Sequence, residues 1–399
     1  MAKTRTETWL ALFALAVGLV ITATLGMWGY MSVTSKPHHP NPQDAPSVAR
    51  ATPAQQWTNA VQQAQQVARA ALTEQNLPGL SVAAGVDGEI VWAEGFGWAD
   101  LDTRVPVSPE MRFRIGTASV VLTSAAVGLL FEKHQLKPDD EIQKYVPEFR
   151  KKDWPVTVRQ LMGHTSGVRN DGGDEGPLFG ERCRRPVDAM RFFADRELLF
   201  QPGSQYAYSS YGWIVLSAAI EAAAGEPFLS FMQERIFERL DMDDTIADST
   251  EAIPNRVTFY FPRFAADPHY GLHLMRPLDL SCYAGASVFL STPSDLVRFG
   301  MAVNAGTLLQ PATVQLLQTS QRLSTGQETG YGLGWDVEAV TLAGRATRTA
   351  GHNGDVLGGM TASLITSPDH RIAVAVTSNI SYTDTNAVAL RIAEAFVRR

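Results

Sequence analysis

The segment Trp9–Tyr30 (WLALFALAVGLVITATLGMWGY) carries no charged side chain. As a helix it is long enough to cross the hydrocarbon core of a bilayer. Lys3 and Arg5 precede it and favour a cytoplasmic N-terminus, although Glu7 weakens that bias. We therefore predict a cytoplasmic segment over residues 1–8 and a transmembrane anchor over residues 9–30. The alternative is a cleaved signal peptide, whose apolar region would usually be shorter and would precede a small-x-small cleavage site.

The next segment, SKPHHPNPQDAPSVARATPAQQ (residues 35–56), is rich in proline and polar residues. This composition is typical of an extended tether, so we predict a Pro-rich linker over residues 31–56 and a folded domain over residues 57–399. With the N-terminus in the cytoplasm, that domain lies across the membrane. We therefore expect a single-pass inner-membrane protein with its C-terminal domain in the periplasm or on the extracellular side.

The composition suits a globular protein with a large core, because 45% of the 399 residues are hydrophobic and 19% are charged. The net charge of −7 argues against a nucleic-acid partner, and no Cys/His spacing indicates a zinc site, so we expect neither metal nor cofactor. Cys183 and Cys282 could form a disulfide in an oxidising compartment or lie apart as small buried side chains. The sequence leaves both alternatives open, and it leaves the oligomeric state open too.

The hydrophobic periodicity predicts an alternation of helices and strands. Leu80–Asp100 contains two β-rich runs around Asp87-Gly88, a strong hairpin signal. The other predicted strands are 331–340, 360–366 and 371–377, and the predicted helices are 54–76, 119–134, 157–162, 211–224, 227–240, 296–303 and 386–396. This order predicts an α/β (α+β) fold, in which both ends of the chain complete one antiparallel sheet flanked by helices. A helical subdomain, roughly residues 120–283, is inserted into it.

Several segments then occur in a characteristic order. They are FGWADLDTRVPVSPEMRFRIG, IQKYVPEF, VTVRQLMGHTSGV, PGSQYAYSSYGW, CYAGASVFLSTPSDLVRFG and AGHNGDVLGG. Through them, residues 78–399 resemble the serine β-lactamase and penicillin-binding-protein superfamily. The resemblance is strongest to its class C-like branch, with family VIII esterases, D-aminopeptidases and the mitochondrial serine β-lactamase-like protein. It implies a β-lactamase/transpeptidase-like fold and a site built from three motifs.

The first motif of that family is Ser-x-x-Lys at the start of a helix, where the serine is the nucleophile and the lysine handles its proton. Matching Phe113–Gly116 to the family places Thr117 at the nucleophile and Val120 at the lysine. None of the lysines of the chain stands three residues after a serine or threonine, and the chain contains no lysine after Lys152. Ser119 supplies a spare hydroxyl, turned about 200° from Thr117 on a helix, which we place among the substrate-contacting residues.

The second motif is Tyr208-Ser209-Ser210, in which the resemblance implies that Tyr208 assists proton transfer and that Ser210 contacts substrate. An ordinary tyrosine titrates near pH 10, and no lysine is present to lower that value. We therefore expect Tyr208 to be protonated at neutral pH and to be a poor general base. The alternative role for Tyr208 is that of a buried packing residue.

The third motif is His352-Asn353-Gly354, on or just before a sheet-edge strand. In the family this strand binds the acyl group and its backbone supplies half of an oxyanion hole. His352 is the one side chain of the three motifs that titrates near neutrality, and Asn353 and Gly354 are expected to contact substrate. His164 is interpreted as structural, residues 167–186 as a polar loop, and Ala284–Ser287 either as a ligand contact or as close packing.

The resemblance implies a hydrolase that acts on a small-molecule or peptide substrate with a peptide, ester or amide bond. We expect Thr117, Tyr208 and His352 to be its catalytic residues, with catalysis weakened because Ser-x-x-Lys is replaced by Thr117-Ala118-Ser119-Val120. Loss of the base costs orders of magnitude in rate, so the alternative is a non-catalytic pseudoenzyme that serves as a binding or scaffold module. A Ser/His/Asp hydrolase is disfavoured, because no Gly-x-Ser-x-Gly follows a strand.

Overall fold

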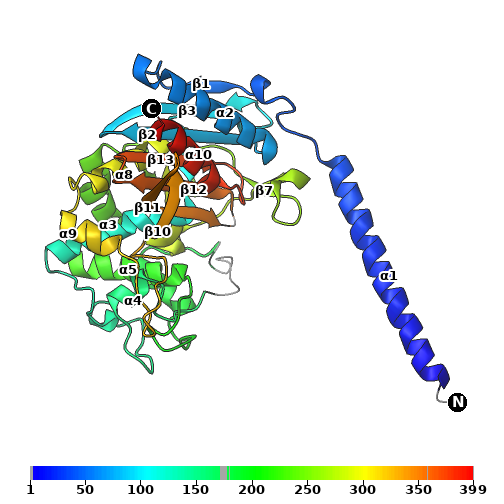
Figure 1. Ribbon diagram of the computed structural model, residues 1–399. Helices are drawn as coiled ribbons and strands as arrows, with labels where there is room; N and C mark the ends of the chain where they lie inside the picture. The colour runs from blue at the N-terminus through cyan, green and yellow to red at the C-terminus, as the bar shows by residue number, and fades with distance from the viewer. Residues whose placement is uncertain (1–2, 171–177, 179, 357, 399) are drawn as a thin grey trace.

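A computed structural model describes residues 3–170, 178, 180–356 and 358–398 of the chain. Its first element is the long helix α1 (Lys3–Thr34), which projects away from the rest of the molecule (Figure 1). The part Trp9–Thr34 is long and apolar enough to cross a membrane, and no residue of its apolar 18-residue window is buried by the rest of the chain. These properties fit either a membrane anchor or a signal sequence.

One large antiparallel sheet organises the folded part, with the strand order β1-β3-β2-β13-β12-β11-β10 and β4 paired to β3. The N-terminal hairpin joins the C-terminal strands through β2 and β13, where Val82 lies opposite Val376. The predicted antiparallel sheet, completed by both ends of the chain, is thereby confirmed. The strands are β1 (Ser47–Ala49), β2 (Gly79–Val86), β3 (Glu89–Asp100), β4 (Val105–Pro106), β10 (Asp336–Leu342), β11 (Arg345–Val356), β12 (Met360–Ser367) and β13 (Ile372–Ser378).

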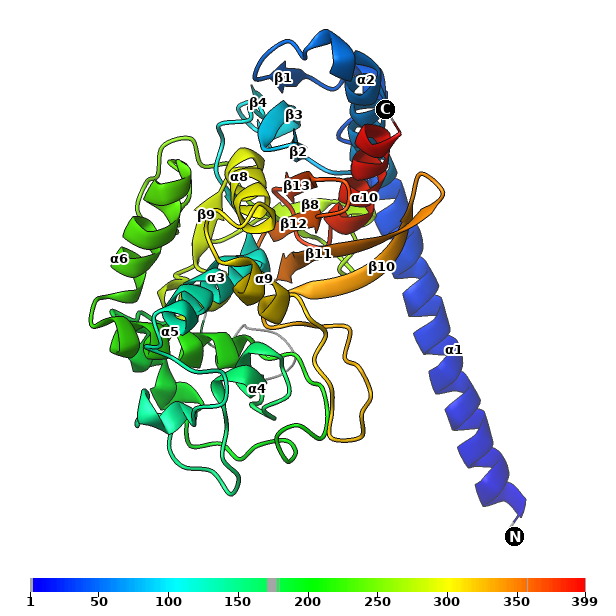
Figure 2. The same cartoon turned by 60° about the vertical axis from the view of Figure 1, so that its left-hand side comes forward.

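Helices cover both faces of this sheet (Figure 2). The terminal helices α2 (Thr58–Glu74) and α10 (Thr385–Val397) pack together on one face and bury apolar side chains such as Trp57 and Phe396. On the other face, α8 (Pro293–Asn304) packs against β2, β12 and β13. It begins at the predicted N-cap, where the Thr292 hydroxyl accepts from the Asp295 backbone N–H.

The helical part lies beside the sheet and is built around α3 (Ser119–Glu132) and α5 (Ser210–Ala224). The remaining helices and strands are α4 (Val158–Met162), α6 (Phe228–Met232), α7 (Ala284–Ser287), α9 (Pro311–Leu317), β5 (Phe113–Arg114), β6 (Ile246–Ala247), β7 (Tyr260–Pro262), β8 (Leu272–Leu274) and β9 (Phe289–Ser291). At Gly285, a methyl group would lie 2.5 Å from the Thr123 hydroxyl. The small-residue segment Ala284–Ser287 therefore serves close packing of α7 against α3 and α5.

Three sequence-based expectations differ from the structure. The strand predicted from Tyr331 begins at Asp336, because the chain first loops back through Gly334, whose φ of +92° requires glycine. The helix predicted over residues 227–240 is α6 followed by a π-turn (Gln233–Phe237) and a 3₁₀ turn. The strand β11 was missing from the predicted strands, except that His352-Asn353-Gly354 was placed on or just before an edge strand, since its alternating Thr, Gly and charged residues give no apolar period.

Much of the segment predicted as a linker docks on the domain. Arg69 on α2 donates to the carbonyl oxygens of Pro42 and Ala45, and β1 adds a strand beside β3. Backbone polar groups in an extended segment bind any available partner, and the open edge of β3 offers a row of them. The tether between α1 and the domain is therefore shorter than the composition indicates.

The structure decides the cysteine pairing. Cys183 and Cys282 form a disulfide with their Cα atoms 4.9 Å apart, across a sequence separation of 99 residues. It ties the segment that precedes the 3₁₀ helix Pro186–Phe192 to the turn that precedes α7. Part of the polar loop predicted over residues 167–186 lies outside the described residues, namely 171–177 and 179.

Candidate active site

The head of α3 is pressed directly against strand β11. A 3₁₀ turn, Gly116–Ala118, leads into the helix and carries Thr117, which is 6% exposed. The Thr117 hydroxyl donates to the carbonyl oxygen of Asn353 at 3.2 Å. The first and third predicted motifs are therefore adjacent in space, as the resemblance implies.

Gly354 makes this close approach of β11 to the turn feasible. A Cβ atom at this position would lie 2.2 Å from the Ile115 carbonyl oxygen and 2.6 Å from the Ala118 nitrogen. Real Cβ atoms do not approach backbone atoms so closely, so any side chain here would push the strand off the helix head. Gly354, predicted to contact substrate, is thus placed facing the backbone of residues 115–118.

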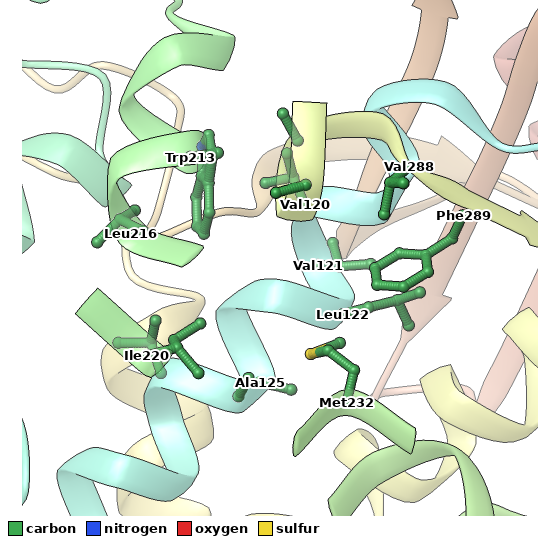
Figure 3. Packing of buried hydrophobic residues seen from close by; sticks show 14 of the residues in the cluster. Val120, Val121, Leu122, Ala125, Trp213, Leu216, Ile220, Met232, Val288 and Phe289 are labelled. Carbon is green, nitrogen blue, oxygen red and sulfur yellow. The ribbon is translucent and has the colours of Figure 1, made fainter. Parts of the chain in front are cut away.

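Position 120, where the resemblance implies a lysine, lies in the apolar core. Val120 is fully buried in the same cluster as Trp213 of α5 and Val288, as Figure 3 shows. Ser119, predicted to contact substrate, is also fully buried, and its hydroxyl has no hydrogen-bond partner within the described residues. The 3₁₀ turn before α3 therefore supplies one partly accessible hydroxyl, that of Thr117, and the described residues of α3 supply no base.

The Tyr208 loop is held in place by His164. The buried His164 ring accepts the backbone N–H of Ser209 at its Nδ1, at 3.0 Å, and lies 4.1 Å from the half-buried Tyr208 ring between centroids. Ser209 is the N-cap of α5, and the next residue, Ser210, is buried as the first residue of the helix. His164, interpreted as structural from the sequence, does position the second motif. Ser210 is placed at the start of α5, next to Tyr208.

His352 is buried and both of its ring nitrogens are hydrogen-bonded. Its Nδ1 lies 2.9 Å from the Asn353 carbonyl oxygen, and its Nε2 lies 2.9 Å from the hydroxyl of Tyr331. A carbonyl oxygen only accepts, so Nδ1 carries the proton of the neutral ring. Nε2 is then the acceptor, and Tyr331 donates to it. The lone pair that a general base would use is therefore occupied by Tyr331.

Burial keeps this group of rings uncharged. It lowers the pKa of His352, and the nearby Asp336 carboxylate and the Asn353 backbone oppose that shift without overcoming it. Burial, and next the neighbouring His352, lower the pKa of His164 well below its ordinary value. For Tyr331, burial and next the neighbouring Tyr208 raise the pKa well above 10. At neutral pH we therefore expect a neutral cluster, without an imidazolium or a phenolate.

Asn353 presents its backbone and its side chain to different parts of the molecule. Its carbonyl oxygen accepts from both Thr117 and His352, and its N–H lies 3.4 Å from an Asp336 carboxylate oxygen. Successive side chains of a strand point to opposite faces, so its side chain lies on the face opposite His352. There it lines a pocket with Thr385 and Asn386 of α10. The contact between the Asn353 side chain and substrate therefore stays a prediction.

Sequence reasoning missed Tyr331, which contacts His352 directly. Tyr331 is 2% exposed, and its ring also lies 4.7 Å from that of His164. The available signal was a tyrosine before Gly332-Leu333-Gly334, a glycine-rich loop in which a strand had been expected. As for metals, the described residues contain no group of three or more His, Cys, Asp or Glu side chains that could hold an ion.

Lowered histidine pKa values predict a pH dependence of stability. Burial lowers the pKa of His38 to about 4 and also lowers that of His39. The site adds two more such groups, His164 and His352. Both have a folded pKa below the unfolded value near 6.5, so the unfolded chain binds more protons as the pH falls. Between pH 7.5 and 5.5, each should lower the free energy of unfolding by up to about 1.4 kcal/mol per pH unit. Burial raises the pKa of Asp295 to about 6. The folded chain therefore binds this proton at a higher pH than the unfolded chain does, so this one group increases the free energy of unfolding as the pH falls.

Urea denaturation across that pH range measures the slope. His352→Asn should make it shallower, and the same substitution at the exposed His273 is the matched control. A slope identical in the wild type and in His352→Asn would show that His352 does not contribute.

Known proteins resemble this chain both in sequence and in fold. Residues 61–398 match the family model described as Beta-lactamase. The chain is 27% identical to the mitochondrial serine beta-lactamase-like protein LACTB of Bos taurus, over 81% of this chain and 77% of that protein. It is 25% identical to penicillin-binding protein 4* of Bacillus subtilis (strain 168), over 75% of this chain and 67% of that protein. The D-amino acid amidase of Ochrobactrum anthropi SV3 has the same fold, with a TM-score of 0.72, 22% identity and coverage of 86% of this chain and 99% of the amidase.

Proposed function

We propose that this chain, which belongs to the beta-lactamase family, is a membrane-anchored protein that binds peptide, ester or amide ligands beside Thr117, Tyr208 and His352. In this proposal its site hydrolyses such ligands very slowly or not at all. The family membership provides the fold and the hydrolase ancestry. The proposal concerns what this particular site does with a ligand.

One observation carries the proposal, which is that the Thr117 hydroxyl donates to a backbone carbonyl oxygen rather than to a base. A carbonyl oxygen cannot take up the proton that an attacking hydroxyl must lose. His352 donates to the same carbonyl through Nδ1, and Tyr331 occupies its Nε2. General-base assistance is typically worth about 10²–10⁴ in rate, so its loss leaves binding without efficient turnover.

The surroundings of Thr117 still favour ligand binding. The residue lies at the N-terminal end of α3, where the helix dipole favours a partly negative carbonyl oxygen. Beyond Gly351 the strand β11 extends past β10, so residues 352–356 pair with β12 alone. A peptide or acyl ligand can pair with a strand edge of this kind, in competition with the Thr117 hydroxyl for the Asn353 carbonyl oxygen.

The anchoring part of the proposal rests on α1. Its apolar span is long enough for a bilayer, and a membrane-spanning helix needs an apolar surface of this kind. The Cys183–Cys282 disulfide supports a domain in an oxidising compartment such as the periplasm or the extracellular side, because disulfides persist there. Together these features support a single-pass protein with its folded domain outside the cytoplasm.

An acylation assay tests the catalytic part. The full chain in a non-ionic detergent is incubated with a chromogenic β-lactam, a p-nitrophenyl ester and a serine-directed acylating probe, and its mass is then measured. We expect no covalent adduct and no hydrolysis above that of Thr117→Ala. Fast turnover, or an adduct that disappears in Thr117→Ala, would overturn the non-catalytic proposal.

The second candidate is a slow hydrolase in which Thr117 itself is acylated. The position of its hydroxyl at the head of α3, beside an open strand edge, favours this candidate. It predicts a slow adduct in the same assay, located on Thr117. The double substitution Thr117→Ser with Val120→Lys provides a further comparison, provided that circular dichroism shows the variant to be folded.

A further inference from the structure

A second pocket opens between residues 249–259 and residues 274–278. None of the three motif residues Thr117, Tyr208 and His352 lines it. Three arginines do, namely Arg114, Arg256 and Arg276. A concave surface with three guanidinium groups is suited to an anion, since each presents planar N–H donors to a carboxylate or phosphate.

Arg114 and Arg256 share one carboxylate at the back of this pocket. Arg114 donates through Nε to an Asp248 oxygen at 2.7 Å, and Arg256 donates through Nη1 to the other Asp248 oxygen at 3.0 Å. Arg114 is only 4% exposed and Asp248 only 8%. The shared pair therefore holds the two guanidinium groups rigidly in place.

Both arginines retain N–H groups that bind no other described residue. Arg114 also donates through Nη1 to the Gly358 carbonyl oxygen, which leaves its Nη2 without a partner among the described residues. Arg256 donates through Nη1 to Asp248 and to the Ser249 carbonyl oxygen. Its Nε and Nη2 likewise have no hydrogen-bond partner among the described residues. These remaining donors are available to a ligand in the pocket.

The pocket carries a surplus of positive charge. Arg276 is exposed at its rim and forms no ion pair with any described residue. Three guanidinium groups against the single Asp248 carboxylate leave two positive charges uncompensated. Burial lowers the pKa of Arg114, and the neighbouring Arg256 lowers it further, whereas Asp248 opposes both. An anion in the pocket would relieve this repulsion between neighbouring cations.

Part of the pocket lining is apolar. It includes Phe259, Ile253, Met275 and Leu278, and the Phe259 ring lies 4.3 Å from the Arg114 guanidinium carbon. From this pairing of unsatisfied guanidinium donors with an apolar lining, we infer a binding site for an anionic amphiphile. The ligand carries a phosphate or carboxylate on a short apolar chain, and its anion contacts Arg256 and Arg276.

The pocket lies on the side of the domain nearest α1. Leu274 of β8 lines it and is 66% exposed. The β7–β8 hairpin contacts the C-terminal end of α1 through a hydrogen bond from Trp28 to Tyr270 and one from Arg263 to Thr34 (Figures 1 and 2). With α1 in a bilayer, the pocket is therefore within reach of lipid headgroups, although a free anion of the same chemistry could also enter.

Calorimetric titration of the full chain, in a non-ionic detergent, with hexyl phosphate tests the site. We expect saturable binding that Arg276→Gln and Arg256→Gln each weaken by about tenfold or more, because each removes a charged hydrogen-bond donor. Arg345→Gln, at an exposed arginine of the β10–β11 hairpin, and Thr117→Ala should leave it unchanged. Absence of binding, unchanged affinity in Arg276→Gln, or equal affinity for 1-hexanol would overturn the inference.

The same titration in nanodiscs identifies the source of the anion. If lipid headgroups occupy the pocket, the apparent affinity for hexyl phosphate should be lower in phosphatidylglycerol discs than in phosphatidylcholine discs, through competition. Equal affinity in both discs would assign the site to a free anion. Both results require binding that depends on Arg276, and neither depends on whether Thr117 is catalytically active.

Discussion

Replacing Val120 by lysine should lower the free energy of unfolding by about 3–5 kcal/mol, the usual cost of a buried charge without a partner. Val120 is fully buried among apolar side chains, and position 120 is where the resemblance to active relatives implies a lysine. The core around Trp213 and Val288 therefore has no place for an ammonium group. Urea denaturation of the full chain at pH 7.5 measures the loss, with Val120→Met as an apolar control of similar length.

The pH dependence of this loss in unfolding free energy shows whether it comes from burial of the lysine charge or from disturbed packing. A lysine buried in an apolar site has a folded pKa below its unfolded value near 10.4. The destabilisation should therefore grow as the pH falls from 10 toward neutrality, because the unfolded chain then binds the additional proton. A loss below about 1 kcal/mol at pH 7.5, independent of pH, would show that the side chain at position 120 can reach water.

Removal of the disulfide should have an effect of similar size. The bond closes a loop with a sequence separation of 99 residues, and for a loop of about 100 residues the chain-entropy model gives about 4–5 kcal/mol. Cys183 and Cys282 are both buried, so the double substitution to alanine keeps the site apolar. We expect the urea midpoint of this variant to fall accordingly.

Reduction of the wild type is the matched control for this prediction. Dithiothreitol should shift the wild-type midpoint by about as much as the double substitution and should leave the variant unchanged. If the wild type shows the same midpoint with and without the reductant, the bond does not contribute to stability. Loss of the bond should destabilise mainly the helical part of the domain, because the disulfide joins the segment before the 3₁₀ helix Pro186–Phe192 to the turn before α7.

The site combines a retained framework with altered chemistry. The turn that bears Thr117, the Tyr208 loop and the His352 strand meet as the motif order implies. Two hydrogen bonds then satisfy His352, and burial favours the neutral form of each neighbouring ring. A proton that leaves Thr117 has no acceptor among the described residues that contact it. This lack of an acceptor comes from the hydrogen bonds of Thr117 and His352 together, and no single substitution accounts for it.

The sequence alone was sufficient for the strongly periodic and locally encoded features. The apolar segment Trp9–Tyr30, the Asp87-Gly88 hairpin and the Thr292 N-cap follow from length, turn type and capping chemistry, which involve only neighbouring residues. The order of helices and strands was also sufficient to predict the antiparallel sheet, and the order of motifs identified Val120 as the residue at the position of the family's lysine. Each of these predictions depends on residues that are close together in the chain or on their order.

Tertiary structure alone decided the features that depend on distances between remote segments. The pairing of Cys183 with Cys282, the hydrogen bond of Tyr331 to His352 and the docking of the linker join residues that no local pattern connects. The strand β11 has no apolar period, and only its pairing with β10 and β12 identifies it as part of the sheet. Hydrogen bonds and burial between distant residues depend on the packed chain, so the protonation state and partner of each site residue could be assigned only there.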